Sequence, residues 1–428
     1  MSTKYVIGYD LNDLVSQISY FELNNPGQIP ESIAGGGEEE QPGIPTVLSK
    51  RKGVSQWDYG NAAKAMVKSS DASLVTNLLS IASTGARIEL EGDAYDATEL
   101  LILFVRRSLN SLAMIMSPED VECMIITVES LEGNMLDVVE KVAMALPISR
   151  DRIIIQSYEE SIFYYLLHQP SELWDHDVAV FDYSGNCLEA YEMWMNRRCQ
   201  PVVSFVDRTQ LKDIRSPKEV FERDLSEGKE ARLDEKIRQT LKQYFDGKNV
   251  GTVFLLGAGF EGGWCDGTLK YLCMGKRVFQ GRNLYSKGAC YSAHDRIQPC
   301  DLNSEYVFLG ADKLKLNVGI KMIVRGQEEY MALADAGTNW YKAEKSYEFI
   351  LGNEKEVSVL LTPLDGKNKE NVTIDLSSLP ERPARASRLK LTISFISQTR
   401  LCIRIEDRGF GEFYPATGKV WEKLVDMA

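Results

Sequence analysis

Residues 178–186 read VAVFDYSGN and repeat the pattern of residues 5–13, YVIGYDLND, near the start of the chain. In both stretches a β-branched and aromatic run ends at an aspartate, and a short polar turn follows. An alternating run comes next in each case, LVSQISYFE after the first turn and CLEAYEMWM after the second, so each stretch predicts a β-hairpin. Two copies of one strand-turn-strand pattern indicate a duplicated α/β unit.

The segments around the two hairpins predict the rest of two α/β lobes. Residues 24–45 include Gly35–Gly37 and Glu38–Glu40, a composition that predicts a mobile loop. Between the hairpins, the predicted elements are a helix within Asp93–Ile115, a strand at ECMIITVES, a helix at MLDVVEKVAMAL, a strand at RIIIQS and a helix at Glu159–His168.

The second lobe continues with the strand PVVSFV and a charged segment, residues 211–249, that predicts a helical region. Its start signals are Ser216, Pro217 and Glu219, and its apolar stripe consists of Leu233, Ile237, Leu241 and Tyr244. The strand TVFLL and a short helix from about Asp266 complete this lobe.

Beyond residue 305 the pattern changes to short alternating runs separated by Gly, Pro, Asn and Asp, which predicts an antiparallel β domain. The last segment, VWEKLVDMA, predicts a short helix. We therefore expect a first lobe at 1–175, a second lobe at 176–304 with a helical insertion at 207–250, and a β domain at 305–428.

The length, charge and composition of the chain disfavour several classes of function. With 428 residues the chain is too long for one ordinary core, and its net charge of −13 disfavours nucleic acid as a partner. No leader and no apolar stretch of about 18 residues is found, so we expect no membrane partner and a cytoplasmic location.

The eight cysteines lack paired CxxC spacing, which favours reduced thiols over a disulfide framework. Cys290 and His294 could form half of a metal site, but no second pair follows them. The sequence therefore predicts no zinc site.

A third turn follows TVFLL and reads Gly257-x-Gly259-x-x-Gly262, which resembles a dinucleotide fingerprint. That motif needs an acidic residue about 20 positions later, and none occurs between Gly267 and His294. Arg277 or Arg282 could instead accept a ribose phosphate, so an NADP site stays open as an alternative. No GxxxxGK[ST] is present, which excludes a P-loop.

The three turns together predict a nucleotide cleft. Two facing hairpins offer backbone N–H groups to phosphates, and carboxylates such as Asp10 and Asp182 can hold Mg²⁺ through its waters. A glycine-rich third turn, Gly257–Phe260, lets a base and ribose lie against the backbone.

In their order along the chain, these turns resemble the two phosphate motifs and the adenosine motif of the actin and DnaK-type heat-shock ATPases. VAVFDYSGN resembles the second phosphate loop, and TVFLLGAGFEGGWCDGTLKYL with NLYSKGACYSA resembles the adenosine motif and the helix after it. PTVLSKRKGVSQWDYGNAAKAM is similar to an early strand and helix of the chaperones. KSYEFILGNEKEVSVLLTPLDG and LPERPARASRLKLTISFISQTRLCIRIEDRG resemble their β-sandwich substrate-binding domain.

The resemblance implies an actin-like ATPase fold of two duplicated ribonuclease-H-like subdomains, followed by an antiparallel β-sandwich. It implies ATP or ADP with Mg²⁺ as cofactors and a protein or peptide client as partner. Asp10 and Asp182 would organise the metal through water, and Gln156 would position the attacking water. The remaining implied contacts are Leu11, Asn12, Asp13, Ser184, Gly185 and Asn186 for phosphate, and Gly257, Ala258, Gly259 and Phe260 for adenosine.

Several departures weaken the enzymatic expectation. The chaperones carry Gly-Thr-Thr where this chain has Asn12, Asp13 and Leu14, so two hydroxyl donors are lost. If Asp13 faced the phosphates, its charge would oppose theirs. A neutral amide at Gln156 is also a weaker base than the chaperones' glutamate.

Three functions remain open from the sequence. The first is a divergent, lidless chaperone-like switch that binds an adenine nucleotide with slow or no hydrolysis. The second is a pseudo-ATPase interaction scaffold that binds no nucleotide, and the third is a small-molecule kinase of the same fold. The oligomeric state is not predicted.

Overall fold

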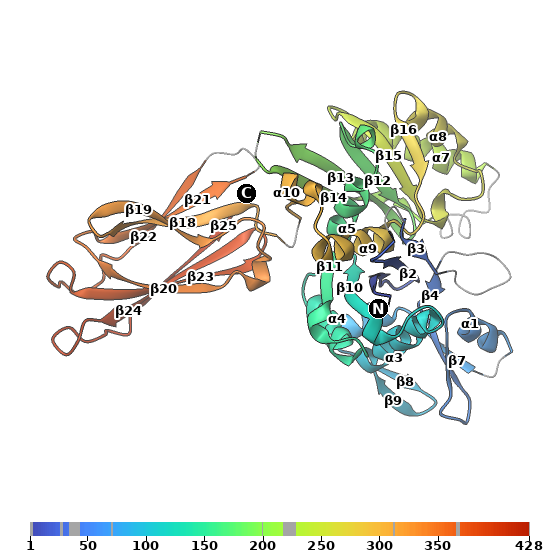
Figure 1. Ribbon diagram of the computed structural model, residues 1–428, viewed down its shortest axis with the longest axis horizontal. Coiled ribbons are helices and arrows are strands. Elements are labelled where there is room, and N and C mark those ends of the chain that lie inside the picture. The colour runs from blue at the N-terminus through green and yellow to red at the C-terminus, as the bar shows by residue number, and fades with distance from the viewer. Residues whose placement is uncertain are drawn as a thin grey trace. The chain divides into compact units, whose positions relative to one another are not determined.

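The computed structural model describes residues 3–25, 29–33, 43–69, 72–198, 200–216, 228–310, 313–364 and 369–427. The chain forms two compact units (Figure 1). Unit 1 consists of Met1–Trp194 and Val206–Ser304, and unit 2 consists of Met195–Phe205 and Glu305–Ala428. Most of the glycine- and glutamate-rich part of the expected mobile loop lies outside the described residues.

The first sheet of unit 1 has the strand order β11-β10-β1-β2-β3, and β4 also pairs with β2. β1 runs antiparallel to β2 and parallel to β10, which in turn runs parallel to β11. The bounds are β1 Tyr5–Asp10, β2 Val15–Glu22, β3 Glu31–Ser32, β4 Ile44–Pro45, β10 Val121–Val128 and β11 Ile153–Ser157. The first predicted hairpin is therefore confirmed.

The second sheet has the order β16-β15-β12-β13-β14-β17. β12 runs antiparallel to β13 and parallel to β15, and β15 runs parallel to β16. The bounds are β12 Asp177–Asp182, β13 Cys187–Asn196, β14 Val202–Arg215, β15 Val250–Leu256, β16 Arg277–Gln280 and β17 Tyr306–Phe308. Apart from β17, the second sheet is arranged like the first, with β16, β15, β12, β13 and β14 in the places of β11, β10, β1, β2 and β3. The parallel and antiparallel pairs described above also correspond. We call the parts of unit 1 built on these sheets its first and second halves.

Two helices pack between the halves of unit 1. α5 (Tyr158–Leu167) follows the last strand of the first sheet, and α9 (Leu284–Ile297) follows β16. The helices pack on each other, and α9 also packs on β1, β2 and β10. α5 in turn contacts the second sheet. The ring of Tyr165 packs in an edge-to-face arrangement on the ring of Phe254 in β15, with the ring centroids 5.9 Å apart.

The other elements of unit 1 surround these sheets. A small sheet has the order β6-β5-β7, and β8 pairs with β9. The bounds are α1 Gly60–Lys68, α2 Leu78–Ser83, α3 Ala97–Leu109, α4 Met135–Ala145, α7 Lys229–Tyr244, α8 Asp266–Cys273, α10 Asp301–Glu305, β5 Leu48–Arg51, β6 Trp57–Tyr59, β7 Ala72–Val75, β8 Arg87–Leu90 and β9 Asp93–Asp96. The helix predicted within Asp93–Ile115 is α3, which begins at Ala97. Asp96 caps it by accepting hydrogen bonds from the backbone N–H groups of Thr98 and Glu99.

Of the charged segment 211–249, the described residues form the end of a strand and one helix. β14 continues to Arg215 as part of the second sheet, and the helix α7 begins at Lys229. The predicted apolar stripe is confirmed, since Leu233, Ile237, Leu241 and Tyr244 are the buried residues of α7. Of the predicted start signals, Pro217 and Glu219 lie outside the described residues.

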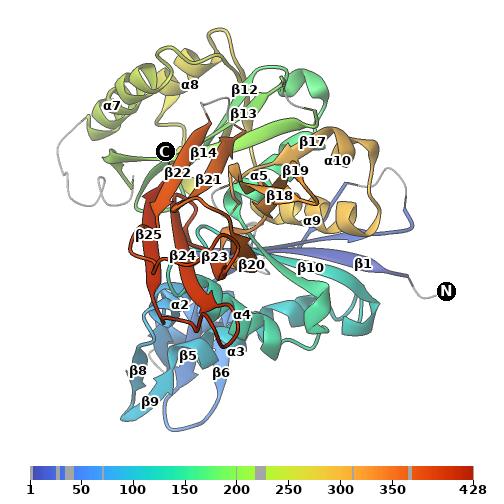
Figure 2. The same ribbon diagram turned by 90° about the vertical axis from the view of Figure 1, so that its left-hand side faces the viewer.

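Unit 2 contains two four-stranded antiparallel sheets, of order β19-β18-β21-β22 and β20-β23-β24-β25, whose strands are the orange and red arrows in Figure 2. Their apolar side chains share one core. The bounds are β18 Leu316–Val324, β19 Gln327–Ala334, β20 Lys345–Leu351, β21 Glu356–Pro363, β22 Glu370–Asp375, β23 Ser387–Ser397, β24 Arg400–Gly409 and β25 Val420–Asp426. The predicted antiparallel β region at the C-terminus is confirmed.

The helix predicted at the C-terminus is wrong. Residues Val420–Asp426 form the strand β25, which pairs antiparallel with β24. Trp421 and Val425 both pack on the core, and a spacing of four residues fits a strand as well as a helix. Pairing with β24 decides between the two.

No helix among the described residues is long and apolar enough to cross a membrane. The described residues also contain no group of three or more His, Cys, Asp or Glu side chains that could hold a metal ion. Cys290 is buried and donates through its thiol to the carbonyl oxygen of Val6.

Candidate functional site

Asp10 and Asp182 occupy equivalent places in the two halves of unit 1. Each is the last residue of the central strand of its sheet, β1 or β12. Asp10 is only 2% exposed, and Asp182 is half-buried. The two carboxylates are close enough for the charge of Asp182 to act on the pKa of Asp10.

A stacked pair of tyrosines joins these carboxylates. The hydroxyl of Tyr158 donates to Oδ1 of Asp10 at 2.6 Å, and the hydroxyl of Tyr285 donates to Oδ2 of Asp182 at 2.8 Å. The two rings are nearly parallel, at an interplanar angle of 9°, and their centroids are 3.7 Å apart. Tyr158 begins α5 and Tyr285 lies in the first turn of α9, so the pair bridges the two halves.

Burial controls the protonation of Asp10, Tyr158 and Tyr285. Burial, together with the smaller effect of the Asp182 charge, raises the pKa of Asp10 from the usual 3.8 to about 7, against the hydrogen bonds from Tyr158 and Asn12. Burial also holds the pKa values of Tyr158 and Tyr285 well above 10. Both phenols therefore stay protonated and act as donors.

The side chain of Asn12 closes the first turn on itself. Its Oδ1 accepts hydrogen bonds from the backbone N–H groups of Leu14 and Val15, both at 2.9 Å. Its Nδ2 donates to the carbonyl oxygen of Val15 at 2.9 Å and lies 3.3 Å from Oδ1 of Asp10. Two backbone donors of this turn are thus already used inside the turn.

Asp13 turns away to the helix α2. Its carboxylate accepts hydrogen bonds from the backbone N–H of Leu79 at 2.8 Å and from the backbone N–H of Ser80 at 3.1 Å. The hydroxyl of Ser80 also donates to it. Its negative charge therefore stabilises the start of α2.

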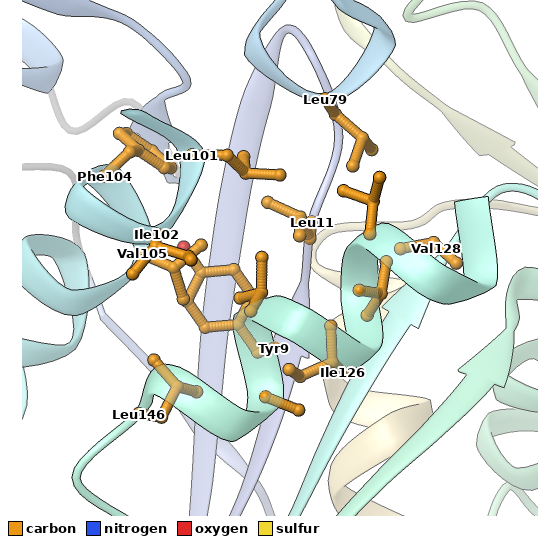
Figure 3. Close-up of a cluster of buried hydrophobic side chains, with 14 of the residues drawn as sticks. Tyr9, Leu11, Leu79, Leu101, Ile102, Phe104, Val105, Ile126, Val128 and Leu146 are labelled. Carbon is orange, nitrogen blue, oxygen red and sulfur yellow. The ribbon is translucent and has the colours of Figure 1, made fainter. Parts of the chain in front are cut away.

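Leu11 belongs to the hydrophobic core of the first half. It is fully buried in a cluster with Tyr9, Leu79 and Leu101 (Figure 3). Its backbone N–H donates to the carbonyl oxygen of Thr127 at 3.0 Å. The equivalent bond in the second half joins the N–H of Tyr183 to the carbonyl oxygen of Leu256 at 2.9 Å.

The second turn is more open than the first. Ser184, Gly185 and Asn186 are exposed, and a side chain added at Gly185 would meet no atom within 4 Å. The backbone N–H of Ser184 donates to Oδ1 of Asp182 at 2.9 Å.

The glycines of the third turn give room to the second turn. A Cβ atom on Gly257 would lie 2.5 Å from the backbone nitrogen of Ser184, and one on Gly259 would lie 2.5 Å from the carbonyl oxygen of Tyr183. Phe260 is buried against the ring of Tyr183, with the centroids 5.5 Å apart. Ala258 is the exposed residue of this turn.

Gln156 is fully buried in a separate hydrogen-bonded chain between α5 and α9. Its Nε2 donates to Oγ of Ser161 at 2.7 Å, and its Oε1 accepts from Oγ of Ser292 at 2.9 Å. Ser161 in turn donates to Oγ1 of Thr127 at 2.7 Å. Each end of the Gln156 amide is therefore occupied by protein groups.

Three further residues of the site, Tyr158, Tyr285 and Arg208, were not predicted from the sequence. The guanidinium of Arg208 contacts Glu129 of the first half and Glu189 of the second, the latter at 3.1 Å. The duplicated pattern offered a signal for the tyrosines, since each follows the last strand of its half. Arg208 lies in the strand β14, and nothing in the local sequence sets it apart.

The geometry separates the expected site residues into three groups. Asp10 and Asp182 meet through the tyrosine pair, and the second and third turns lie against each other. Leu11, Asn12, Asp13 and Gln156 are engaged in internal contacts.

The families that match this chain have no known function. No curated protein matches this chain. Residues 313–427 match the domain described as "Domain of unknown function (DUF8552)". Residues 29–311, more than half of the chain, match the family described as "Family of unknown function (DUF5716) C-terminal". The chain therefore belongs to the DUF5716 C-terminal family.

Proposed function

We propose that unit 1 is a divergent relative of the actin and heat-shock ATPases that works as a scaffold and does not hydrolyse ATP. Two sheets with the same strand order, each with an aspartate at the end of its central strand, support the actin-like fold. The second and third turns, which resemble the second phosphate motif and the adenosine motif, also lie against each other.

The side chain of Asn12 carries the proposal. It holds the backbone N–H groups of Leu14 and Val15, which are donors that a phosphate oxygen would need. A hydrated Mg²⁺ would need carboxylate oxygens that face water. Here Oδ1 of Asp10 and Oδ2 of Asp182 accept hydrogen bonds from phenols instead. ATP and Mg²⁺ therefore do not fit this arrangement of the first turn and the carboxylates.

The open second turn favours a second candidate, a chaperone-like switch that binds an adenine nucleotide with slow or no hydrolysis. Space around Gly185 leaves that turn accessible to a phosphate. In this case the nucleotide would have to displace Asn12 from its own turn and part the two tyrosines. Its affinity would be reduced by the free energy of that rearrangement.

Isothermal titration of the full chain with ATP and Mg²⁺ separates the two functions. The scaffold predicts no saturable heat at millimolar nucleotide. The Asp182→Asn variant is the matched control, because it keeps the shape of the side chain and removes its charge. Saturable binding by the wild-type chain that this variant weakens would contradict the scaffold and support the switch.

For unit 2 we propose binding of protein or extended peptide, as the β-sandwich resemblance implies. Ile323 of β18 and Tyr330 of β19 are 74% and 49% exposed. Their register places them on the same face of the hairpin, since Tyr330 pairs with Lys321, two residues from Ile323. This exposed apolar pair supports a contact surface for apolar side chains.

Fluorescence anisotropy with labelled extended apolar peptides tests the role of unit 2. Ile323→Asp in the full chain should weaken peptide binding about tenfold, as expected for loss of a central apolar contact. Ile350→Asp is the control, because Ile350 of β20 is 52% exposed on another strand. Absence of peptide binding, or equal effects of both variants, would rule out this surface.

A further inference from the structure

Arg208 ties the two halves of unit 1 together at the edge of the candidate site. It lies on β14 in the second half, and its guanidinium donates to Glu129, which directly follows β10 in the first half. Its Nε also donates to Oε2 of Glu189 on β13 at 3.1 Å. One cation thus contacts a carboxylate from each half.

The surroundings of Arg208 are strongly acidic. Burial raises the pKa of Glu159. The positive charge of Arg208 lowers this pKa, and the negative charge of Glu129 raises it. Glu129 and Asp182 also raise the pKa of Asp10. Asp182 of the second half and Glu129 of the first thus both act on Asp10, and the positive charge of Arg208 acts on Glu159.

Arg208 also connects to the tyrosine pair. Its guanidinium carbon lies 5.8 Å from the centroid of the Tyr191 ring, and Tyr191 packs edge to face on Tyr285 with the centroids 6.4 Å apart. The chain of contacts runs from Glu129 through Arg208 and Tyr191 to the stacked tyrosines and their aspartates.

The contact with Glu129 is accessible to solvent. The side chain of Glu129 is 54% exposed and that of Arg208 is 26% exposed. An ion pair in such a place can break without unfolding the protein, and salt weakens it. The pair with Glu189 lies within the second half and can persist when the first is broken.

We propose that the Arg208–Glu129 ion pair is a latch that holds the two halves of unit 1 together at this edge of the candidate site without any ligand. When it opens, the halves lose this restraint at the edge of the site, and solvent reaches Tyr158 and Tyr285 more often. This inference concerns the resting state and does not depend on whether a nucleotide binds.

Hydrogen exchange of the full chain at low ionic strength tests the latch. Glu129→Gln should speed exchange about three- to fivefold in peptides that cover the first turns of α5 and α9, the range expected from loss of one partly exposed ion pair. These turns do not contain the altered residue. High salt should have the same effect on the wild-type chain and little further effect on the variant.

Glu140→Gln is the matched control. Glu140 pairs with Arg150 entirely within the first half, and its side chain is 31% exposed. This variant should leave exchange at Tyr158 and Tyr285 unchanged. Arg208→Gln should act like Glu129→Gln or more strongly, because it also releases Glu189.

Two outcomes would overturn the latch. One is equal exchange at the two tyrosines in Glu129→Gln and Glu140→Gln. The other is a rise spread evenly over unit 1 together with a lower melting temperature, which would make the ion pair a general stabilising contact.

Discussion

The protonation of Asp10 makes the stability of unit 1 depend on pH. The pKa of Asp10 rises from the usual 3.8 in the unfolded chain to about 7 in the folded protein, mainly through burial. Between these values the folded state binds the proton and the unfolded state has released it. The contribution of Asp10 to folding therefore becomes less favourable as the pH rises from about 4 to about 7.

The Asp10→Asn variant should remove this pH dependence. We expect it to be more stable than the wild-type chain at pH 8, because the buried charge is gone, and similar to it near pH 4. Urea unfolding across this pH range measures the difference, with Asp246→Asn as the control at an exposed aspartate after α7. A difference between Asp10→Asn and wild type that does not change with pH would contradict the assignment.

At the scale of elements, glycines let α9 lie directly against its neighbours. A Cβ atom on Gly8 of β1 would lie 2.0 Å from the carbonyl oxygen of Ser286, and one on Gly288 would lie 1.9 Å from the carbonyl oxygen of Ser161. Both contacts are with backbone, which cannot move aside as a flexible side chain can. The packing of α9 on β1 and α5 therefore depends on these two glycines.

Gly288→Ala should destabilise unit 1 by about 3 kcal/mol or prevent its folding, because the added methyl group overlaps the backbone of α5. Gly185→Ala is the matched control, since nothing lies within 4 Å of its Cβ position, and it should change stability by less than about 0.5 kcal/mol. Thermal unfolding followed by circular dichroism compares the two. Equal melting temperatures would show that α5 and α9 are not in such close contact.

At the scale of the whole molecule, each unit has its own hydrophobic core, so we expect two unfolding transitions. Unit 2 contains a buried ion pair that identifies its transition. Both oxygens of Asp407 accept hydrogen bonds from Arg382, at 2.9 and 2.8 Å, and the two side chains are 0% and 5% exposed.

Asp407→Asn should lower the transition of unit 2 alone, by about 3 to 5 kcal/mol, because it leaves the charge of Arg382 buried without its partner. Burial alone would raise the pKa of Asp407, but hydrogen bonds from Arg382, Thr417 and Gly409 hold it well below the usual value. The stabilisation from Asp407 is therefore fully present above the pKa that Asp407 has in the unfolded chain. It is lost as the pH falls from that value through the lower pKa of the folded state.

Differential scanning calorimetry of the full chain measures this effect. The variant should lose stability in the unit 2 transition at neutral pH, and its difference from wild type should shrink in strong acid. A single transition, or a shift of both transitions together, would contradict independent unfolding of the two units.

The local pattern of the sequence was enough to predict both hairpins, the strands β10 and β11 and the helices α3, α4 and α5 between them, and the antiparallel C-terminal region. Each depends on periods of 2 or 3.6 residues and on turn residues, which are properties of neighbouring positions. The segment Val420–Asp426 was misread because its apolar spacing fits both periods, and only pairing with β24 makes it a strand.

The sequence by itself determined that two equivalent turns would each present an aspartate, because a strand followed by a polar turn is a local feature. Only the tertiary structure decided what surrounds those aspartates. Asn12 folds back on its own turn, Asp13 reaches α2, and the tyrosine pair and Arg208 come from segments far apart in the chain. The direction of a side chain at the end of a strand depends on which helices pack there, and that packing involves residues distant in the sequence.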